Sequence, residues 1–337
     1  MSKNLDRELE IASKAVQLCA DLTKQLQRRL RDDSTVKKSD FSPVTIGDFA
    51  VQALLTSVIH QEFPNDTFLA EESADELRQN EPLLDQVWQL VESHQPSFAV
   101  ASPALKVPKS KAELMDLIDM GGRNDKTDSG RTWVFDPIDG TATFMQGQQY
   151  AINCAFLIDG KEQIGLIGCP NLAPNASTTH EDATDPDGLG ILIYAVRGKG
   201  TWKRNMQASS DLLPATQIPR HGDSAGKDQL IWSDCSTYTS TIQHLHQQVA
   251  VKLNTSWPGV DLYSSLMKYA ALGLGHASIC IRIFKYTSWR SNMWDHAGGV
   301  LIFEEAGGKV TDLEGKGIDF GKGRKMVSTL SLPGRLK

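Results

Sequence analysis

The sequence predicts an α/β protein that forms two domains or one large α/β domain, and three observations support this prediction. The chain has 337 residues, more than one small hydrophobic core requires. Segments with the apolar spacing of helices alternate with short β-branched or aromatic runs bounded by turn residues. Apolar residues make up 40% of the chain and charged residues 23%, which is ordinary for a soluble globular protein.

Two helices are expected before the first strand. Apolar residues recur at three- and four-residue steps across about the first thirty positions. This spacing predicts a long amphipathic helix, packed on the protein's own sheet rather than in a coiled-coil dimer. A polar loop over 32–43 leads to a second amphipathic helix, and Asp48 falls at its start. Taken alone, Asp48 would be an ordinary acid that complements the helix dipole.

Acidic residues follow the first predicted strand. Residues 66–70 predict a short strand that ends in Glu71 and Glu72, and only one of two consecutive side chains should face a site. A further helix is predicted over 83–91. From 93 to about 130 the signals are mixed: prolines indicate a loop, and 112–120 has the spacing of a helix.

The stretch over 133–141 places two carboxylates directly after an apolar run. Its first three residues predict a buried strand, and Pro137, which lacks the N–H that continues a ladder, should end it at about Asp136. Asp136 and Asp139 would then bracket a turn in which the carbonyl of Ile138 also faces outward. Because Mg²⁺ favours an all-oxygen environment, this turn is a candidate metal site.

The same stretch also contains a candidate phosphate site. Gly140 lets the backbone approach a ligand closely, and a helix can begin at Thr141. The first N–H groups of that helix would face the two aspartates, as in other phosphate sites at helix starts. A lone Asp-x-x-Asp-Gly is most often an ordinary turn, and the longer string favours a functional site.

The rest of the chain is predicted to alternate strands and helices. Strands at 150–158 and 163–168 are joined by Asp159-Gly160, a strong hairpin signal. The apolar-poor stretch over 174–188 is a surface loop or the joint between domains, which gives domains over 1–173 and 174–337. Later elements are a hairpin over 191–202, strands at 230–233 and 277–283, and helices at 242–252, 265–272 and 300–306, with Asp295 at the start of the last.

Charge and cysteine content narrow the class of protein. With 35 Lys and Arg against 41 Asp and Glu, the net charge is -6, and no basic stripe suggests a nucleic-acid partner. The five scattered cysteines suggest reduced core residues, and neither a signal peptide nor a long apolar run is evident. We therefore expect a cytoplasmic monomer without membrane association.

Three separated motifs resemble those of one family. They are Leu-Ala-Glu-Glu-Ser at 69–73, Asp-Pro-Ile-Asp-Gly-Thr at 136–141 and Trp-Asp-His-Ala-Gly-Gly at 294–299. In this order they resemble the signatures of the inositol monophosphatase superfamily of lithium-sensitive, Mg²⁺-dependent phosphatases. The resemblance implies a layered αβαβα sandwich of the inositol monophosphatase/fructose-1,6-bisphosphatase type, with the site between two domains.

Within that superfamily, the chain is most similar to the 3'(2'),5'-bisphosphate nucleotidases. The segments that carry this similarity are 42–48, 167–172, 268–270 and 319–324. The similarity implies a phosphoric monoester hydrolase of sulfur metabolism. Such an enzyme releases the 3'-phosphate of 3'-phosphoadenosine 5'-phosphate, giving AMP and phosphate, by attack of a metal-activated water.

The resemblance also implies roles for single residues. The ligands implied for two or three Mg²⁺ are Glu71, Asp136, the carbonyl of Ile138, Asp139 and Asp295. Asp48 and Thr141 fall on the pair that positions and deprotonates the attacking water. The implied substrate contacts are the N–H groups of Gly140 and Thr141 and, for a bisphosphate nucleotide, Ser265, Lys268 and Arg282. Most metal ligands would lie in the N-terminal domain, and Asp295 with the specificity residues in the C-terminal one.

Some positions depart from the nucleotidase pattern while the implied metal ligands are intact. The departures are Ala142, Thr143, Gln146, Cys235 and Ser264. They leave open an inositol polyphosphate 1-phosphatase or a phosphatase of a specialised metabolite. A catalytically silent metabolite-binding regulator is the alternative from another class.

Overall fold

The computed structural model describes residues 4–32, 43–101, 107–221, 230–286 and 288–326. The polar loop predicted over 32–43 therefore lies almost wholly outside the described residues.

Seven strands form one sheet in sequence order, from β1 to β7. β1 and β2 run parallel, and every other neighbouring pair in this sheet runs antiparallel. The strands are β1 (Thr67–Ala70), β2 (Arg131–Asp139), β3 (Ala151–Ile158), β4 (Lys161–Cys169), β5 (Ile191–Val196), β6 (Thr201–Asn205) and β7 (Thr216–Gln217).

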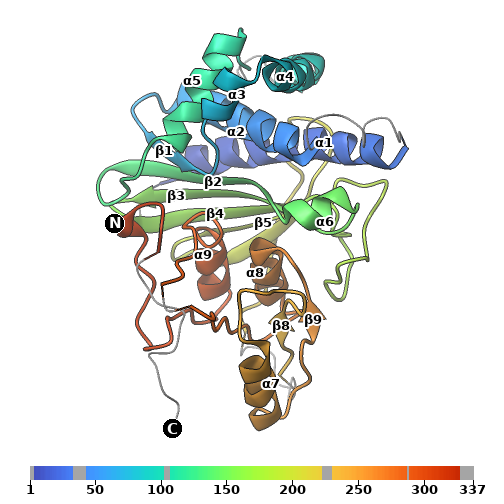
Figure 1. Ribbon diagram of the computed structural model, residues 1–337, viewed down its shortest axis with the longest axis vertical. Helices are drawn as coiled ribbons and strands as arrows, with labels where there is room; N and C mark the ends of the chain where they lie inside the picture. Colours follow the sequence, from blue (N-terminus) through green and yellow to red (C-terminus); the bar gives the residue numbers. More distant parts are fainter. Residues whose placement is uncertain (1–3, 33–42, 102–106, 222–229, 287, 327–337) are drawn as a thin grey trace.

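Helices cover both faces of this sheet (Figure 1). On one face lie α1 (Asp6–Asp32) and α2 (Pro43–Glu62), and apolar side chains fill the space between them and the sheet. On the other face lie α8 (Ser265–Leu274) and α9 (Gly299–Glu305), which bury a second apolar cluster against it. Strands β2 to β5 are therefore largely buried on both sides, which explains their nearly continuous apolar runs.

Two further layers lie beyond α8. A small parallel sheet pairs β8 (Ser233–Asp234) with β9 (Val260–Asp261), and α7 (Gln243–Lys252) lies on its far side in Figure 1. The order of layers is thus helix, sheet, helix, sheet, helix. This order confirms the predicted layered α/β fold.

The second helix differs from its prediction in two ways. It begins at Pro43, so Asp48 lies in its second turn and not at its start. It is also buried around nearly its whole circumference rather than amphipathic. This burial reflects close packing against α1 and the sheet. At Gly47, for example, a Cβ would meet Ile138 Cδ1 at 2.9 Å and Leu26 Cδ2 at 3.0 Å. A helix enclosed by α1, the sheet and other helices has no polar face to present.

Further helices complete the first layer and the turns around the sheet. They are α3 (Asp75–Gln79), α4 (Glu81–Ala101), α5 (Lys111–Gly122), α6 (Thr141–Met145) and a 3₁₀ turn, η2 (Phe320–Lys322). The loop predicted from residue 93 is wrong as far as Ala101, because α4 continues through Pro96. A proline removes one helical hydrogen bond, and a long helix can continue past that loss.

The strand predicted over 277–283 is also wrong. Within the described residues, Ile279 makes only an isolated bridge to Trp232. The strand predicted at 230–233 is found as β8, displaced toward Asp234. Several apolar residues of 277–283 line a cavity instead of pairing with a neighbouring strand. An apolar run indicates that a segment is buried, and residues in the wall of a cavity can be apolar for the same reason as residues in a sheet.

The boundary predicted after residue 173 falls between β4 and β5, and these two strands pair with each other over six residues of each. The central sheet therefore continues across that point, and the division into two domains remains a prediction. No helix among the described residues is long and apolar enough to cross a membrane. All five cysteines are described, and none forms a disulfide.

Candidate metal and substrate site

A β-bulge in β2 places Asp136 and Asp139 on the same face of the sheet. Three residues apart on a regular strand, the two side chains would point to opposite faces. In the ladder with β3, however, Asp136 pairs with Asn153 and Asp139 pairs with Ala151, so β2 contains one extra residue. Because Asn153 and Ala151 share a face, their partners do too. The strand therefore continues past Asp136, where the sequence predicted its end, and Pro137 lies inside the bulge.

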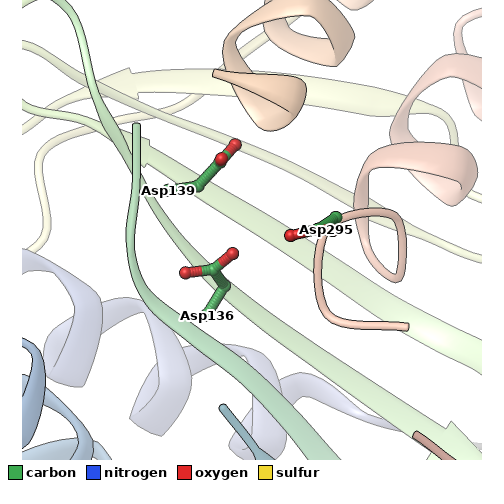
Figure 2. A group of neighbouring side chains, drawn as sticks. All are labelled: Asp136, Asp139 and Asp295. Carbon is green, nitrogen blue, oxygen red and sulfur yellow. The ribbon is translucent and has the colours of Figure 1, made fainter. Parts of the chain in front are cut away.

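Asp295 reaches the same place from the segment before α9. Figure 2 shows its side chain turned toward Asp136 and Asp139 on β2. One carboxylate oxygen from each residue lies within 4.8 Å of the others. The amide of Asn153 donates to the carbonyl of Trp294 at 2.9 Å and ties this segment to β3. Three aspartates far apart in the sequence therefore form one group, which we call the acid cluster.

The other two predicted acids, Glu71 and Asp48, lie close enough to the acid cluster for their charges to affect the pKa of Asp136. Burial is the main cause that raises the pKa of Asp136 well above its usual value, followed by the charges of Glu71, Asp139, Asp295 and Asp48. Asp136 is only 2% exposed. The structure thus groups three of the five predicted carboxylates, and the charges of Glu71 and Asp48 act on Asp136 from nearby.

Like charges held this close call for a cation. Asp136 Oδ1 and Asp48 Oδ1 are both buried, and neither has a hydrogen-bond partner among the described residues. A buried acceptor left without a partner is costly, whereas carboxylate oxygens are the ligands of hard cations such as Mg²⁺. The donor set of the acid cluster therefore fits a divalent cation.

Asp139 also connects the acid cluster to α8. Its Oδ2 accepts hydrogen bonds from the hydroxyl of Ser264 at 2.6 Å and from the backbone N–H of Leu266 at 2.5 Å. Ser264 is in turn the N-cap of α8 and accepts the N–H of Met267 at 2.9 Å. One of the positions that departs from the nucleotidase pattern is therefore built into the site.

Two of the three predicted nucleotide-site residues lie around one unpredicted aromatic ring, and the third is hydrogen-bonded to one of them. The guanidinium of Arg282 donates to the hydroxyl of Ser265 at 3.1 Å and lies 5.4 Å from the ring centre of Tyr238. The ammonium of Lys268 lies 4.6 Å from the same ring centre and donates to the carbonyl of Tyr263 at 3.0 Å. In the described part of the chain, neither cation forms an ion pair with a carboxylate.

The start of α6 agrees only partly with the prediction. Gly140 adopts a φ of 99°, which favours glycine, and a Cβ there would meet Thr143 Oγ1 at 2.9 Å. Thr141 is the first residue of α6, which spans only Thr141–Met145, so its dipole is small. Thr141 is exposed and, in the described structure, has no hydrogen bond to Asp48. Their pairing around a water stays a prediction.

Glu71 and Ile138 are placed at the edge of the acid cluster. Glu71 is exposed and lies outside the group of three aspartates. Its carbonyl accepts a hydrogen bond from Arg324 at 3.0 Å, and the guanidinium of Arg324 stacks 4.7 Å from the ring centre of Trp294. Ile138 lies in the bulge, outside the paired register, with its side chain in the core. Their roles as ligands stay predictions.

Sequence reasoning missed three residues that shape this site. Tyr238 carries no local signal beyond its nearness to 235–237, where the pattern departs. Glu72 was weighed only as an alternative to Glu71, yet its charge contributes, after burial, to the raised pKa of Asp48. Arg324 ends the segment 319–324, which the resemblance included, but only the fold shows that it holds Glu71 beside Trp294.

A cavity of about 520 Å³ adjoins the acid cluster, and Asp295 and Arg282 both line it. Its wall also includes Trp289, whose side chain is 45% exposed and stacks on Phe284 at a centroid distance of 5.5 Å. An acidic group, a guanidinium and an exposed indole thus face the same space.

The fold and the acid cluster define a layered α/β protein with a candidate metal centre, and comparisons with known proteins give the class. The model of the inositol monophosphatase family matches residues 4–336. The chain is 36% identical over 334 residues to a 3'(2'),5'-bisphosphate nucleotidase of Emericella nidulans, covering 96% of this chain and 92% of the relative. A nucleotidase of the same name from Schizosaccharomyces pombe is 35% identical, with coverage of 96% and 90%.

The solved structures agree on the fold. Inositol monophosphatase II from Staphylococcus aureus matches with a TM-score of 0.58 at 18% identity, covering 94% of this chain and 88% of that one. The chain belongs to the inositol monophosphatase family.

Proposed function

We propose that the protein is a Mg²⁺-dependent phosphomonoesterase that hydrolyses the 3'-phosphate of 3'-phosphoadenosine 5'-phosphate to give AMP and phosphate. The observation that carries this proposal is the position of two cations beside the acid cluster, Lys268 and Arg282, which pair with no carboxylate among the described residues. Buried charges are normally paired, so these cations call for an anion next to the metal site. A bisphosphate would place one phosphate at the metal site and the other against these two cations.

The acids would have two roles, metal binding and activation of the attacking water. Asp136, Asp139 and Asp295, with Glu71 and the carbonyl of Ile138, would hold two or three Mg²⁺ ions. Bound Mg²⁺ supplies a polarised water and neutralises charge on the phosphate. Asp48 would accept the proton of the attacking water, with Thr141 orienting that water. Burial raises the pKa of Asp48 well above its usual value, which makes its carboxylate a stronger base.

The remaining groups would bind the nucleotide. Arg282, held by Ser265, and Lys268 would contact the second phosphate, for which a planar guanidinium is well suited. The indole of Trp289 offers an exposed ring on which a nucleobase could stack. Relatives that carry the name 3'(2'),5'-bisphosphate nucleotidase are 33–36% identical to this chain, which supports the same substrate.

A panel of substrates tests the proposal. Phosphate release should be measured with Mg²⁺ on 3'-phosphoadenosine 5'-phosphate, its 5'-sulfated form, inositol 1,4-bisphosphate and inositol 1-phosphate, each with and without Li⁺. We expect the highest kcat/KM for the first nucleotide. Preference for inositol 1,4-bisphosphate would make the protein an inositol polyphosphate 1-phosphatase. No turnover of any substrate, with Mg²⁺ binding shown by calorimetry, would instead support the catalytically silent protein.

A further inference from the structure

A large cavity is lined by the two cations, and Tyr238 is not among its described lining residues. It has a volume of about 990 Å³, and Ser265, Lys268 and Arg282 form part of its wall. The rest of the lining is largely apolar, with side chains such as Leu272 and Phe303. Cavities of about 300–1,000 Å³ with mostly apolar walls and a few polar groups are typical of small-molecule sites.

The charges of this cavity favour an anionic ligand. Lys268 and Arg282 line it, and so do the exposed residues Arg220 and Lys309. Asp312 is the single carboxylate among its described lining residues. Its Oδ1 already accepts two backbone N–H groups of its own loop, at 2.8 and 2.9 Å. The net charge facing the cavity is therefore positive.

Arg282 belongs to two cavities at once. It lines the cavity of about 520 Å³ that contains Asp295 and the cavity of about 990 Å³ that contains Lys268. A phosphate bound to Arg282 would therefore stand where the two spaces meet. Any group attached to that phosphate, on the side away from the acid cluster, would have the larger cavity in front of it.

Resting on the proposed function, we propose that the protein also takes 3'-phosphorylated nucleotides whose 5'-phosphate carries a long, uncharged arm, and that the arm occupies the larger cavity. The reaction stays hydrolytic: water attacks the 3'-phosphorus, the bond between phosphorus and the 3'-oxygen breaks, and that oxygen takes a proton. The products are inorganic phosphate and the nucleotide with a free 3'-hydroxyl, its arm unchanged.

Coenzyme A is a suitable probe, because it joins a 3'-phosphate to an arm on its 5'-diphosphate. Its kcat/KM with Mg²⁺ should be compared with that of 3'-phosphoadenosine 5'-phosphate in the wild type and in Leu313→Trp. Leu313 lies in the cavity wall and is half-buried, so a tryptophan there should narrow the cavity. Leu253→Trp is the matched control, since Leu253 lies at the end of α7 and outside the lining.

We expect the wild type to hydrolyse both compounds with kcat/KM values within about tenfold of each other. Leu313→Trp should lower the value for coenzyme A by at least about tenfold and change that for the compact bisphosphate less than about twofold, whereas Leu253→Trp should change neither. A binding measurement is independent of turnover: calorimetry with dephospho-coenzyme A, which lacks the scissile phosphate, should show affinity in the wild type that Leu313→Trp weakens.

Two results would overturn the proposal. One is rapid hydrolysis of the compact bisphosphate with no hydrolysis of coenzyme A. The other is an equal loss on both compounds in Leu313→Trp while Leu253→Trp is normal. Failure of the proposed function itself would look different, because the compact bisphosphate would then not be hydrolysed by the wild type at all.

Discussion

The carboxylate of Asp139 and the hydroxyl of Ser264 are joined by a hydrogen bond of 2.6 Å, which connects the acid cluster to the start of α8. The same hydroxyl caps α8 by accepting the N–H of Met267 at 2.9 Å. The helix that carries Ser265 and Lys268 is therefore positioned by a residue of the acid cluster. The candidate metal ligands and the candidate substrate contacts form one connected unit.

This connection predicts the effect of Ser264→Ala. Loss of the cap should lower the free energy of unfolding by about 1 kcal/mol. Loss of the bond to Asp139 should in addition weaken Mg²⁺ binding by roughly tenfold, as for other groups that orient a metal ligand. Denaturant unfolding and Mg²⁺ calorimetry measure the two effects separately.

Ser110→Ala is the matched control for this variant. Ser110 caps α5 by accepting the N–H of Glu113 at 3.2 Å, and it makes no contact with the acid cluster. Its loss should lower stability similarly and leave Mg²⁺ affinity unchanged. Equal Mg²⁺ affinity in both variants would refute the link between Ser264 and the metal site.

Close packing behind Asp295 predicts a second effect. A Cβ at Gly165 of β4 would lie 2.4 Å from the carbonyl oxygen of Gly298, at the start of α9. Gly165→Ala should therefore push the segment that carries Asp295 away from the sheet. We expect a loss of about 1–3 kcal/mol in stability, as for other overpacked sites, together with weaker Mg²⁺ binding.

Gly317→Ala is the control for this substitution. A Cβ at Gly317 would meet nothing within 4 Å, and Gly317 is not among the glycines with a left-handed backbone. Its unfolding midpoint and Mg²⁺ affinity should match those of the wild type. If Gly165→Ala behaves in the same way, α9 is not held against β4 as described.

The buried acids predict how stability depends on pH. Burial, and then the charge of Asp139, raises the pKa of Asp295 to about 7 from a usual value of 3.8. Between these two pH values, the carboxyl of Asp295 is ionised in the unfolded chain and protonated in the folded protein. The metal-free protein should therefore lose stability as pH rises through this window. Bound Mg²⁺ requires the ionised form, so its affinity should rise over the same range.

Thermal unfolding measures this linkage directly. With a chelator present, Tm should fall as pH rises from about 5.5 to about 7. Addition of Mg²⁺ should raise Tm more at the higher pH, because fewer protons must then be displaced. A Tm increase that is the same at both pH values would show that Mg²⁺ does not bind to these carboxylates.

Lys268→Ala tests the second phosphate site. A hydrogen bond to a charged group contributes about 1.5–3 kcal/mol, so the KM for 3'-phosphoadenosine 5'-phosphate should rise by roughly 10- to 100-fold. Adenosine 3'-phosphate has the same base and scissile phosphate but no 5'-phosphate, and its KM should change little. Lys252→Ala, at an exposed lysine in the last turn of α7, is the control. An equal rise for both nucleotides would reject this role of Lys268.

Much of the site could be predicted because its parts carry local signals. Asp136 and Asp139 follow an apolar run, and the fold confirms a strand there. Pairing decided the rest: the bulge that turns both side chains to one face exists only in the ladder with β3, which local sequence does not encode. Pro137 was predicted to end the strand because the bulge that accommodates it cannot be recognised from the local sequence.

Long-range packing explains the other differences. Asp48 was placed at a helix start because the apolar helical spacing begins at the next residue, whereas α2, which is buried on nearly all sides, extends back to Pro43. The approach of Asp295 to Asp136 could be inferred only from the resemblance, since the two residues belong to separate segments. Tyr238 joins Lys268 and Arg282 only in the folded protein.

The proposal that the acid cluster hydrolyses the 3'-phosphate is tested most directly by following the reaction with ³¹P NMR in ¹⁸O-labelled water. With Mg²⁺ and 3'-phosphoadenosine 5'-phosphate, we predict loss of the 3'-phosphate resonance, retention of the 5'-phosphate and one ¹⁸O atom in each released phosphate. Asp136→Asn, folded by circular dichroism, should be at least about 100-fold slower. Release of the 5'-phosphate, or undiminished turnover by Asp136→Asn, would contradict the account.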